Sequence, residues 1–183
     1  MGRRILKYAI LGLLSKQEMS GYDIAAEFQK AIGQFWSAKQ SQIYVELKKL
    51  LEEALISQHI DRSSVRIEKK NYKLTAAGKE ALQTWLLAID HSIETEKDVF
   101  VLKIYFLKHI PKEDIPFLFK NQLKLRMEKL SYLKKQFTLH FSGNKNPYDL
   151  DTEELTDYLI LTKAISREES YICWLNKSFD LIK

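Results

Sequence analysis

The sequence has little of what interrupts helices or supplies covalent and metal-bound frameworks. Its 183 residues include six glycines, three prolines and a single cysteine, Cys173. Few Gly and Pro residues favour a mostly helical chain with short connections. One cysteine excludes an internal disulfide framework and is typical of a reducing compartment. The histidines have no ligand-like spacing, so we expect neither a metal site nor a cofactor; they are His59, His91, His109 and His140.

Long apolar runs and catalytic motifs are also missing. The run from Tyr8 to Leu14 is too short to span a membrane and lacks a small-residue cleavage site, so we expect a soluble, cytoplasmic protein with no membrane partner. No nucleophile–base set, glycine-rich phosphate loop or paired acid motif is present. The acids Asp151 to Asp157 suit the start of a helix, and Cys173 lies in an apolar stripe where a thiol is usually inert. We therefore do not expect an enzyme.

The positive charge is confined to the first half of the chain. Residues 1–88 contain 14 Lys and Arg against 9 Asp and Glu, whereas residues 89–183 contain 15 of each. An excess of five positive charges beside a neutral half favours one module that meets an anion. Because five charges is a small number, a chance fluctuation remains the alternative.

The order of the expected elements is typical of a winged helix-turn-helix. Hydrophobic periodicity predicts three helices, two short strands joined by a polar turn, and a further helix, over residues 3–15, 20–32, 39–54, 55–60, 67–74 and 76–89. Ser20 and Asp23 have capping-box spacing at the start of the second helix. Thr75 is expected to cap the last one, whose apolar face would consist of Leu82, Trp85, Leu86 and Ile89.

The third helix is the one that a winged helix offers to the DNA major groove. Its buried stripe is expected to be Ile43, Leu47, Leu50, Leu51 and Ala54. The helix has no acid before Glu46, whereas a solvated face would accept Glu equally well. Its polar groups can donate to phosphates or read base edges. We therefore expect this face to bind DNA through Lys39, Gln40, Ser41, Gln42, Tyr44 and Lys48.

The predicted hairpin wing carries a second group of positive charges. Arg62, Arg66, Lys69 and Lys70 are expected to contact phosphates, with Lys73 nearby. Lysines on edge strands also prevent aggregation, so edge protection is the alternative reading. Arg3, Arg4 and Lys7 could add phosphate contacts, although basic residues near the start of a sequence are a weak signal.

Three segments resemble the PadR family of transcriptional regulators. They are "SGYDIAAEF", "FWSAKQSQIYVELKKLLEEALI" and "YKLTAAGKEALQTWL", and the likeness continues through "DVFVLKIYFLKHIPKEDIPFLFKNQLKLRMEKL" and "AISREESYICWL". Two positions depart from the family pattern, because Val45 stands where Pro is frequent and Ala54 where Gly is frequent. The resemblance implies a mainly α chain, with a winged helix-turn-helix at residues 1–90 and a helical dimerisation and effector domain at residues 91–183.

The second half independently predicts long helices. Residues 97–109 leave little polar face and should be buried on most sides. Residues 112–137 carry apolar groups at three- and four-residue steps, a coiled-coil-like seam, and Thr152 should begin a final helix that ends near Phe179. An intramolecular hairpin could explain this pattern. We favour a homodimer through Phe119, Leu123, Met127, Leu130, Leu133 and Leu175, because helix-turn-helix proteins usually read two half-sites.

Aromatic residues make a small-molecule pocket conceivable. Trp85, Phe100, Tyr105, Tyr171 and Trp174 could wall such a pocket, although aromatics at helical spacing more often form a core. The resemblance favours a pocket, since members of the family sense phenolic acids or hydrophobic drugs. We therefore expect a homodimeric repressor that binds double-stranded, palindromic operator DNA and is released by a small effector. A protein-interaction module whose basic half binds an acidic protein is the alternative.

Overall fold

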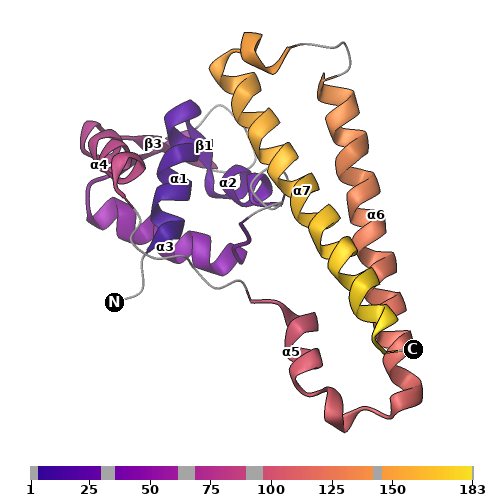
Figure 1. The fold of residues 1–183 in the computed structure, drawn as a ribbon. Helices are drawn as coiled ribbons and strands as arrows, with labels where there is room; N and C mark the ends of the chain where they lie inside the picture. The colour runs from indigo at the N-terminus through magenta and orange to yellow at the C-terminus, as the bar shows by residue number, and fades with distance from the viewer. Residues whose placement is uncertain (1–3, 30–35, 62–68, 90–96, 142–145, 183) are drawn as a thin grey trace. The chain divides into compact units, whose positions relative to one another are not determined.

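The computed structural model describes residues 4–29, 36–61, 69–89, 97–141 and 146–182 (Figure 1). The chain divides into two compact units, residues 1–93 and residues 94–183, and each is described by itself. No helix within the described ranges is long and apolar enough to cross a membrane.

In its described residues, the first unit contains four helices and a small antiparallel sheet. In chain order its elements are α1 (Ile5–Lys16), β1 (Met19–Ser20), α2 (Gly21–Glu27), α3 (Gln40–Glu52), β2 (Ile56–Asp61), β3 (Lys69–Leu74) and α4 (Ala76–Leu87). The strand order is β1-β3-β2, with Met19 opposite Tyr72 and Ile56 opposite Leu74. This confirms the predicted winged-helix order and adds β1, which the sequence pattern did not reveal.

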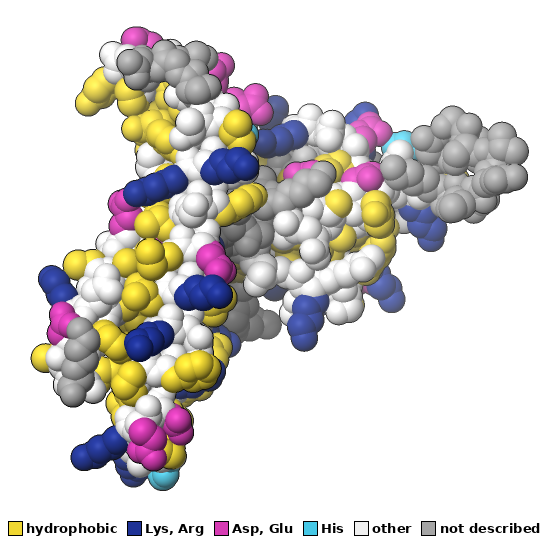
Figure 2. Space-filling view, turned by 90° about the vertical axis from the view of Figure 1, so that its right-hand side faces the viewer, with side chains coloured by type: hydrophobic (Ala, Val, Ile, Leu, Met, Phe, Trp, Pro, Cys, Tyr) yellow, Lys and Arg dark blue, Asp and Glu magenta, His cyan; other side chains and the backbone are white. Residues whose placement is uncertain are grey.

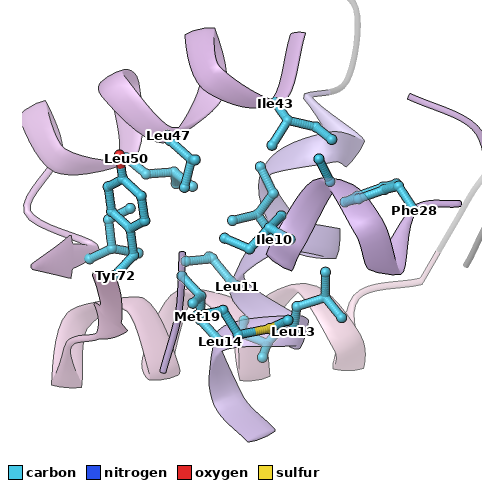
Figure 3. Packing of buried hydrophobic residues seen from close by; sticks show 14 residues of the cluster. Ile10, Leu11, Leu13, Leu14, Met19, Phe28, Ile43, Leu47, Leu50 and Tyr72 are labelled. Atoms are coloured by element: carbon cyan, nitrogen blue, oxygen red, sulfur yellow. The ribbon is translucent and has the colours of Figure 1, made fainter. Parts of the chain in front are cut away.

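The core of this unit lies between α1, α2, α3 and the sheet. Ile43, Leu47 and Leu50 of α3 are buried and point toward Ile10 and Leu11 of α1 (Figure 3). The predicted stripe of α3 is thus confirmed for these three residues, whereas Leu51 is half-buried and Ala54 is exposed beyond the end of the helix. A helix that buries one apolar stripe in this way must expose its opposite side, which fixes the face of α3 that a ligand can reach.

The corner between α3 and β2 depends on backbone hydrogen bonds. Ala54 has a φ of 55°, the left-handed conformation that favours glycine. The Leu55 N–H donates to the Leu50 carbonyl at 3.0 Å, which ends the helix in a Schellman-like turn. Gly78 of α4 approaches this corner so closely that a Cβ there would lie 2.1 Å from the Leu55 carbonyl oxygen. The sheet and α4 are therefore joined at a point that tolerates only glycine.

The structure agrees with the predicted start of the second helix but not with its predicted end, nor with the whole apolar face predicted for α4. The capping box of Ser20 and Asp23 is confirmed, since each side chain contacts the other residue's backbone N–H. The second helix ends at Glu27 instead of near Ile32, and residues 30–35 lie outside the described residues. The apolar face predicted for α4 is wrong at Leu86 and Ile89, which are exposed. The helix turns Leu82 and Trp85 toward the core, so Leu86 lies on another side, and Ile89 follows the end of the helix at Leu87.

The second unit is a helical hairpin with a short additional helix. It comprises α5 (Val99–Tyr105), 3-10 turns at Leu107–His109, Lys112–Asp114 and Pro147–Asp149, and the long helices α6 (Ile115–Phe141) and α7 (Thr152–Asp180). The long helices lie side by side (Figure 1). Phe100, Phe119 and Leu175 form one buried cluster, and Leu133, Leu161 and Ala164 form another.

The seam predicted for dimerisation is used inside one chain. Phe119, Leu133 and Leu175 are buried within the hairpin, Leu123 packs against the first cluster and Leu130 is half-buried, so of the six only Met127 is exposed. The same three- and four-residue spacing serves an intramolecular hairpin, which was the alternative reading.

The expectation that residues 97–109 are buried on most sides is also wrong within the single chain. Phe100 is buried, whereas Val99, Leu102 and Tyr105 are exposed, because a helix of seven residues offers only one side to the hairpin. Figure 2 shows further hydrophobic side chains on the surface of the molecule, between lysines and arginines.

Candidate functional site

The outer face of α3 is exposed to solvent. Ser41, Val45 and Lys48 lie opposite the buried stripe and are exposed, as the helical wheel predicts. The Lys48 side chain is 81% exposed, and its amine lies 4.0 Å from the carboxylate of Glu52 one turn later. On this face no acid precedes Glu52, and Lys48 is a cation that faces solvent.

The polar residues at the start of α3 are not equivalent. Gln40 and Ser41 are exposed, whereas the Gln42 side-chain oxygen accepts a hydrogen bond from the backbone N–H of Lys39 at 3.0 Å. This contact is the reciprocal half of a capping box. The Gln42 oxygen is thus used in the fold, and only its amide donors remain for a ligand.

Tyr44 stands at the edge of the α3 face and packs on the start of α2. A Cβ at Gly21 would lie only 2.7 Å from a Tyr44 ring carbon, so a larger residue there would require the tyrosine ring to shift. Burial, and then the neighbouring Tyr44, raise the pKa of Tyr72 in the sheet below. Tyr44 is about half exposed. It therefore has a fixed position from which its ring edge reaches solvent.

The wing residues are only partly described. Arg62 and Arg66 lie outside the described residues, Lys69 begins β3, and Lys70 is exposed opposite Ile60. The amine of Lys73 lies 2.9 Å from the carboxylate of Glu18, which raises the pKa of Lys73 and lowers that of Glu18. The charge of Lys73 is therefore compensated by the residue before β1.

The basic residues near the start of the sequence do not lie free for phosphate. The Arg4 guanidinium donates to the carboxylate of Glu46, with Nε–Oε1 and Nη2–Oε1 distances of 3.1 and 2.5 Å, and also to Glu53. The amine of Lys7 lies 2.8 Å from Glu53. The proposed phosphate contacts of Arg4 and Lys7 are thus corrected, because both cations pair with acids of α3 or its C-cap; Arg3 lies outside the described residues.

A buried ionic network in the second unit was not predicted from the sequence. Glu168 of α7 is 0% exposed, and its carboxylate lies 3.0 Å from Arg126, 3.3 Å from Arg167 and 3.6 Å from Lys129. A buried carboxylate needs such partners, since desolvation of an unpaired charge is costly. The only sequence signal is that Glu168 lies three residues after Ile165 and seven before Leu175, on the apolar side of α7.

Arg126 extends this network to α5 and to an aromatic ring. Its guanidinium lies 3.6 Å from Asp98 and stacks 3.7 Å from the centre of the Tyr171 ring. Asp98 in turn caps α5 by accepting from the N–H groups of Phe100 and Val101 at 2.8 and 3.1 Å. The position of α5 on the hairpin is thus fixed by charge as well as by the burial of Phe100.

Beside this network lies a pocket with a volume of about 360 Å³. It is lined by Lys97, Asp98, Val99, Phe100, Lys103, Leu118, Gln122, Arg126, Arg167 and Tyr171. Among the described residues, the Arg167 Nε and the Tyr171 hydroxyl are the buried side-chain polar atoms that have no hydrogen bond of regular geometry. Burial, followed by the nearby Asp98 carboxylate, raises the pKa of Tyr171 to about 12, so the hydroxyl stays protonated.

The five aromatic effector candidates separate into three groups. Phe100, Tyr171 and Trp174 lie together, with ring centres 6.3 Å apart for Phe100 and Trp174 and 5.3 Å for Tyr171 and Trp174. Trp85 is stacked on Tyr8 at 4.7 Å in the first unit, where it covers the core. Tyr105 is 80% exposed and contacts Phe106. Only the first group lines pockets beside the buried network.

A winged helix whose third helix exposes a face with no acid before Glu52, followed by a hairpin of two long helices, is the architecture of a winged-helix transcriptional regulator. Residues 10–84 match the model described as the transcriptional regulator PadR-like family, and residues 96–183 match the model described as virulence activator alpha C-term. The negative transcriptional regulator PadR of Bacillus subtilis is 44% identical over 98% of both chains. The chain therefore belongs to the PadR family of transcriptional regulators, and the relatives it matches are regulators and not enzymes.

Solved structures give the same result. The crystal structure of Bacillus subtilis PadR in complex with operator DNA has a TM-score of 0.85 and 43% identity, covering 98% of this chain and 100% of that one. The structure of the same protein with p-coumaric acid has a TM-score of 0.80 at 43% identity, covering 98% and 99%. The Vibrio cholerae virulence activator AphA, 24% identical with a TM-score of 0.73 over 97% of each chain, shares the fold.

Proposed function

We propose that the protein is a homodimeric repressor that binds operator DNA with the first unit and dimerises and binds an effector with the second. The observation that carries this proposal is the exposed face of α3, where Ser41 and Lys48 lie opposite the buried Ile43, Leu47 and Leu50, and Gln40 is exposed at the edge of that face. Donors at the start of such a helix can reach base edges in the major groove, and cations beyond them can reach phosphates. The complex of the Bacillus subtilis relative with operator DNA supports it. A DNA target also implies a cytoplasmic protein.

In this arrangement the DNA contacts divide between α3 and the wing. Lys39, Gln40, Ser41, Tyr44 and Lys48 would lie at the groove, with Gln42 contributing its amide donors only. Arg62, Arg66, Lys69 and Lys70 would reach the flanking phosphates from the wing. These phosphate contacts would add affinity for any sequence, whereas the donors of α3 would select the operator.

The dimer would use apolar residues of the second unit that its own hairpin leaves uncovered. Several large side chains of this kind are exposed, among them Val99, Leu102, Leu125, Met127, Tyr132, Leu139 and Leu159. Exposed apolar surface on long helices favours association with a second copy. Two copies related by a twofold axis would read a palindromic operator with half-sites about 10 base pairs apart or a multiple of that.

The effector would be a small aromatic carboxylic acid bound in the pocket beside Tyr171. Four cations, Lys97, Lys103, Arg126 and Arg167, line this pocket against one carboxylate, Asp98. The unpartnered Arg167 Nε could donate to the acid group, while Phe100 and Tyr171 would contact the ring. The p-coumaric acid complex of the Bacillus subtilis relative supports this class of ligand.

The test uses full-length protein and a duplex that it selects from a random pool. Fluorescence anisotropy should show tight binding to the selected duplex, steep salt dependence and release by p-coumaric acid. Arg167→Met should reduce the sensitivity to the acid, whereas Lys124→Met, on the exposed part of α6, should not. Sedimentation should give twice the mass of the 21.5 kDa chain. Failure to select any duplex would favour the protein-interaction alternative.

A further inference from the structure

The buried acid of α3, Glu46, forms an ion pair with a residue outside the helix. Glu46 belongs to α3 but faces inward, and only 6% of its surface is exposed. One of its two carboxylate oxygens, Oε1, accepts hydrogen bonds from both Nε and Nη2 of Arg4, the residue before α1. Hydrogen bonds between two charged groups are among the strongest in proteins. Arg4 and Glu46 therefore connect the start of α1 to the middle of α3.

A second acid, Glu53, lies about two turns further along α3. Glu53, which caps the C-terminus of α3, accepts from Arg4 and from Lys7, and Lys7 lies in the first turn of α1. Hydrogen bonds to Glu46 and then Glu53 raise the pKa of Arg4, and those from Lys7 and then Arg4 lower the pKa of Glu53. Two carboxylates spaced along one helix are thus held by two cations on another, which restrains rotation and tilt of α3 on α1.

We propose that Arg4 is a positioning residue for operator recognition, which holds α3 in the orientation that reads DNA and does not itself contact phosphate. This inference rests on the proposed function, because it presumes that the face of α3 opposite Glu46 meets the groove. The apolar stripe of α3 resists separation from α1 but not small rotations, since hydrophobic burial is not directional. The ion pairs join particular residues of the two segments, so they resist the small rotations of α3 that the apolar stripe permits.

The competing interpretation, in which Arg4 binds a phosphate, makes a different prediction. A phosphate contact adds affinity to every sequence and contributes about one unit to the slope of binding against salt. A positioning residue acts on base-edge contacts, so it changes the ratio between operator and scrambled duplex and leaves the slope unchanged. A double-mutant cycle separates the two, because only positioning depends on Glu46.

The experiment compares Arg4→Ala, Glu46→Gln, their combination and Arg4→Lys, with Lys48→Ala as the phosphate-contact control. Affinities for selected and scrambled duplexes are measured as a function of salt, at a temperature where circular dichroism shows each variant to be folded. Arg4→Ala should weaken operator binding about tenfold, the scale of a lost hydrogen bond between charged groups, with an unchanged salt slope. The loss should be much smaller in the Glu46→Gln background, and Arg4→Lys should recover most of it.

Four results would overturn this role. Equal losses in both backgrounds together with a lower salt slope, as expected for Lys48→Ala, would make Arg4 a phosphate contact. A lower melting temperature with an unchanged operator-to-scrambled ratio would make the pair merely structural. Failure of the wild-type protein to bind any duplex would remove the proposed function and this role together, whereas wild-type binding with an inert Arg4→Ala would overturn this inference alone.

Discussion

Replacing Gln40 and Gln42 separately by alanine should distinguish a residue that contacts DNA bases from a residue that caps α3. Both residues lie in the first turn of α3, but only Gln42 is used in the fold, where its side-chain oxygen accepts from the Lys39 N–H. Within the described part of the chain the Gln40 side chain makes no hydrogen bond, so removing it leaves the free protein unchanged. Gln40→Ala should therefore act on the complex alone.

The expected magnitudes follow from these contacts. A glutamine that bonds a base edge contributes about 1–3 kcal/mol of discrimination, so Gln40→Ala should weaken operator binding by that amount and scrambled binding much less. Gln42→Ala removes a capping contact, which typically costs about 0.5–1 kcal/mol of stability. Its effect on DNA should be smaller and less selective, since only the amide donors of Gln42 were available.

The assay measures two quantities for each variant, the operator-to-scrambled affinity ratio and the midpoint of urea unfolding. Gln40→Ala should change the ratio and leave the midpoint unchanged, and Gln42→Ala should lower the midpoint. A lower midpoint for Gln40→Ala, or equal losses on both duplexes, would contradict the assignment of this residue to the groove. Ser15→Ala, an exposed position of α1, is a suitable control for the DNA measurements.

Four further changes have defined outcomes. Lys70→Ala should weaken binding to all sequences and reduce the salt slope by about one unit; an unchanged slope would mean that Lys70 only protects a strand edge. Ala54→Gly should raise the free energy of unfolding by about 1 kcal/mol, because it relieves a left-handed φ of 55°; a lower urea midpoint would refute this. Arg126→Met should lower the free energy of unfolding by about 2 kcal/mol. This loss is smaller than that of a fully unpaired buried charge, because Arg167 and Lys129 still face Glu168. The pKa of Tyr171 is raised to about 12 from 10.0, so the folded state holds the hydroxyl proton more tightly than the unfolded state. The stability that this proton contributes is fully present below pH 10 and is lost as the pH rises toward 12. The free energy of unfolding should therefore fall less over this pH range in Tyr171→Phe.

The sequence predicted those parts of the fold that depend on local pattern. The order of helices and strands, the Ser20–Asp23 capping box and the buried stripe of Ile43, Leu47 and Leu50 are confirmed, because periodicity and capping report on neighbours along the chain. The strand β1 was missed because two residues, Met19 and Ser20, carry no alternation. It exists only because the backbone of β3 lies beside it.

Contacts between distant segments could not be predicted in the same way. Nothing in the sequence indicated that Arg4 would meet Glu46, 42 positions away, or that Glu168 would be buried among cations. Hydrophobic spacing also does not say what covers an apolar face. Leu133 lies within its own hairpin and Tyr105 does not, although both belong to apolar helices. For the candidate site, the residues of α3 could be found from sequence, whereas the pocket beside Tyr171 required the structure.

The central claim, that the outer face of α3 enters the major groove, is tested most directly by methylation interference on the selected duplex. Dimethyl sulfate modifies guanine N7, which lies in the major groove. Methylation should prevent binding at guanines in two segments whose centres are about 10 base pairs apart, or a multiple of that, as expected for two copies of one helix. The protein should still bind duplexes that are methylated outside these segments. Binding that is indifferent to guanine N7 methylation throughout a guanine-containing operator would contradict the account.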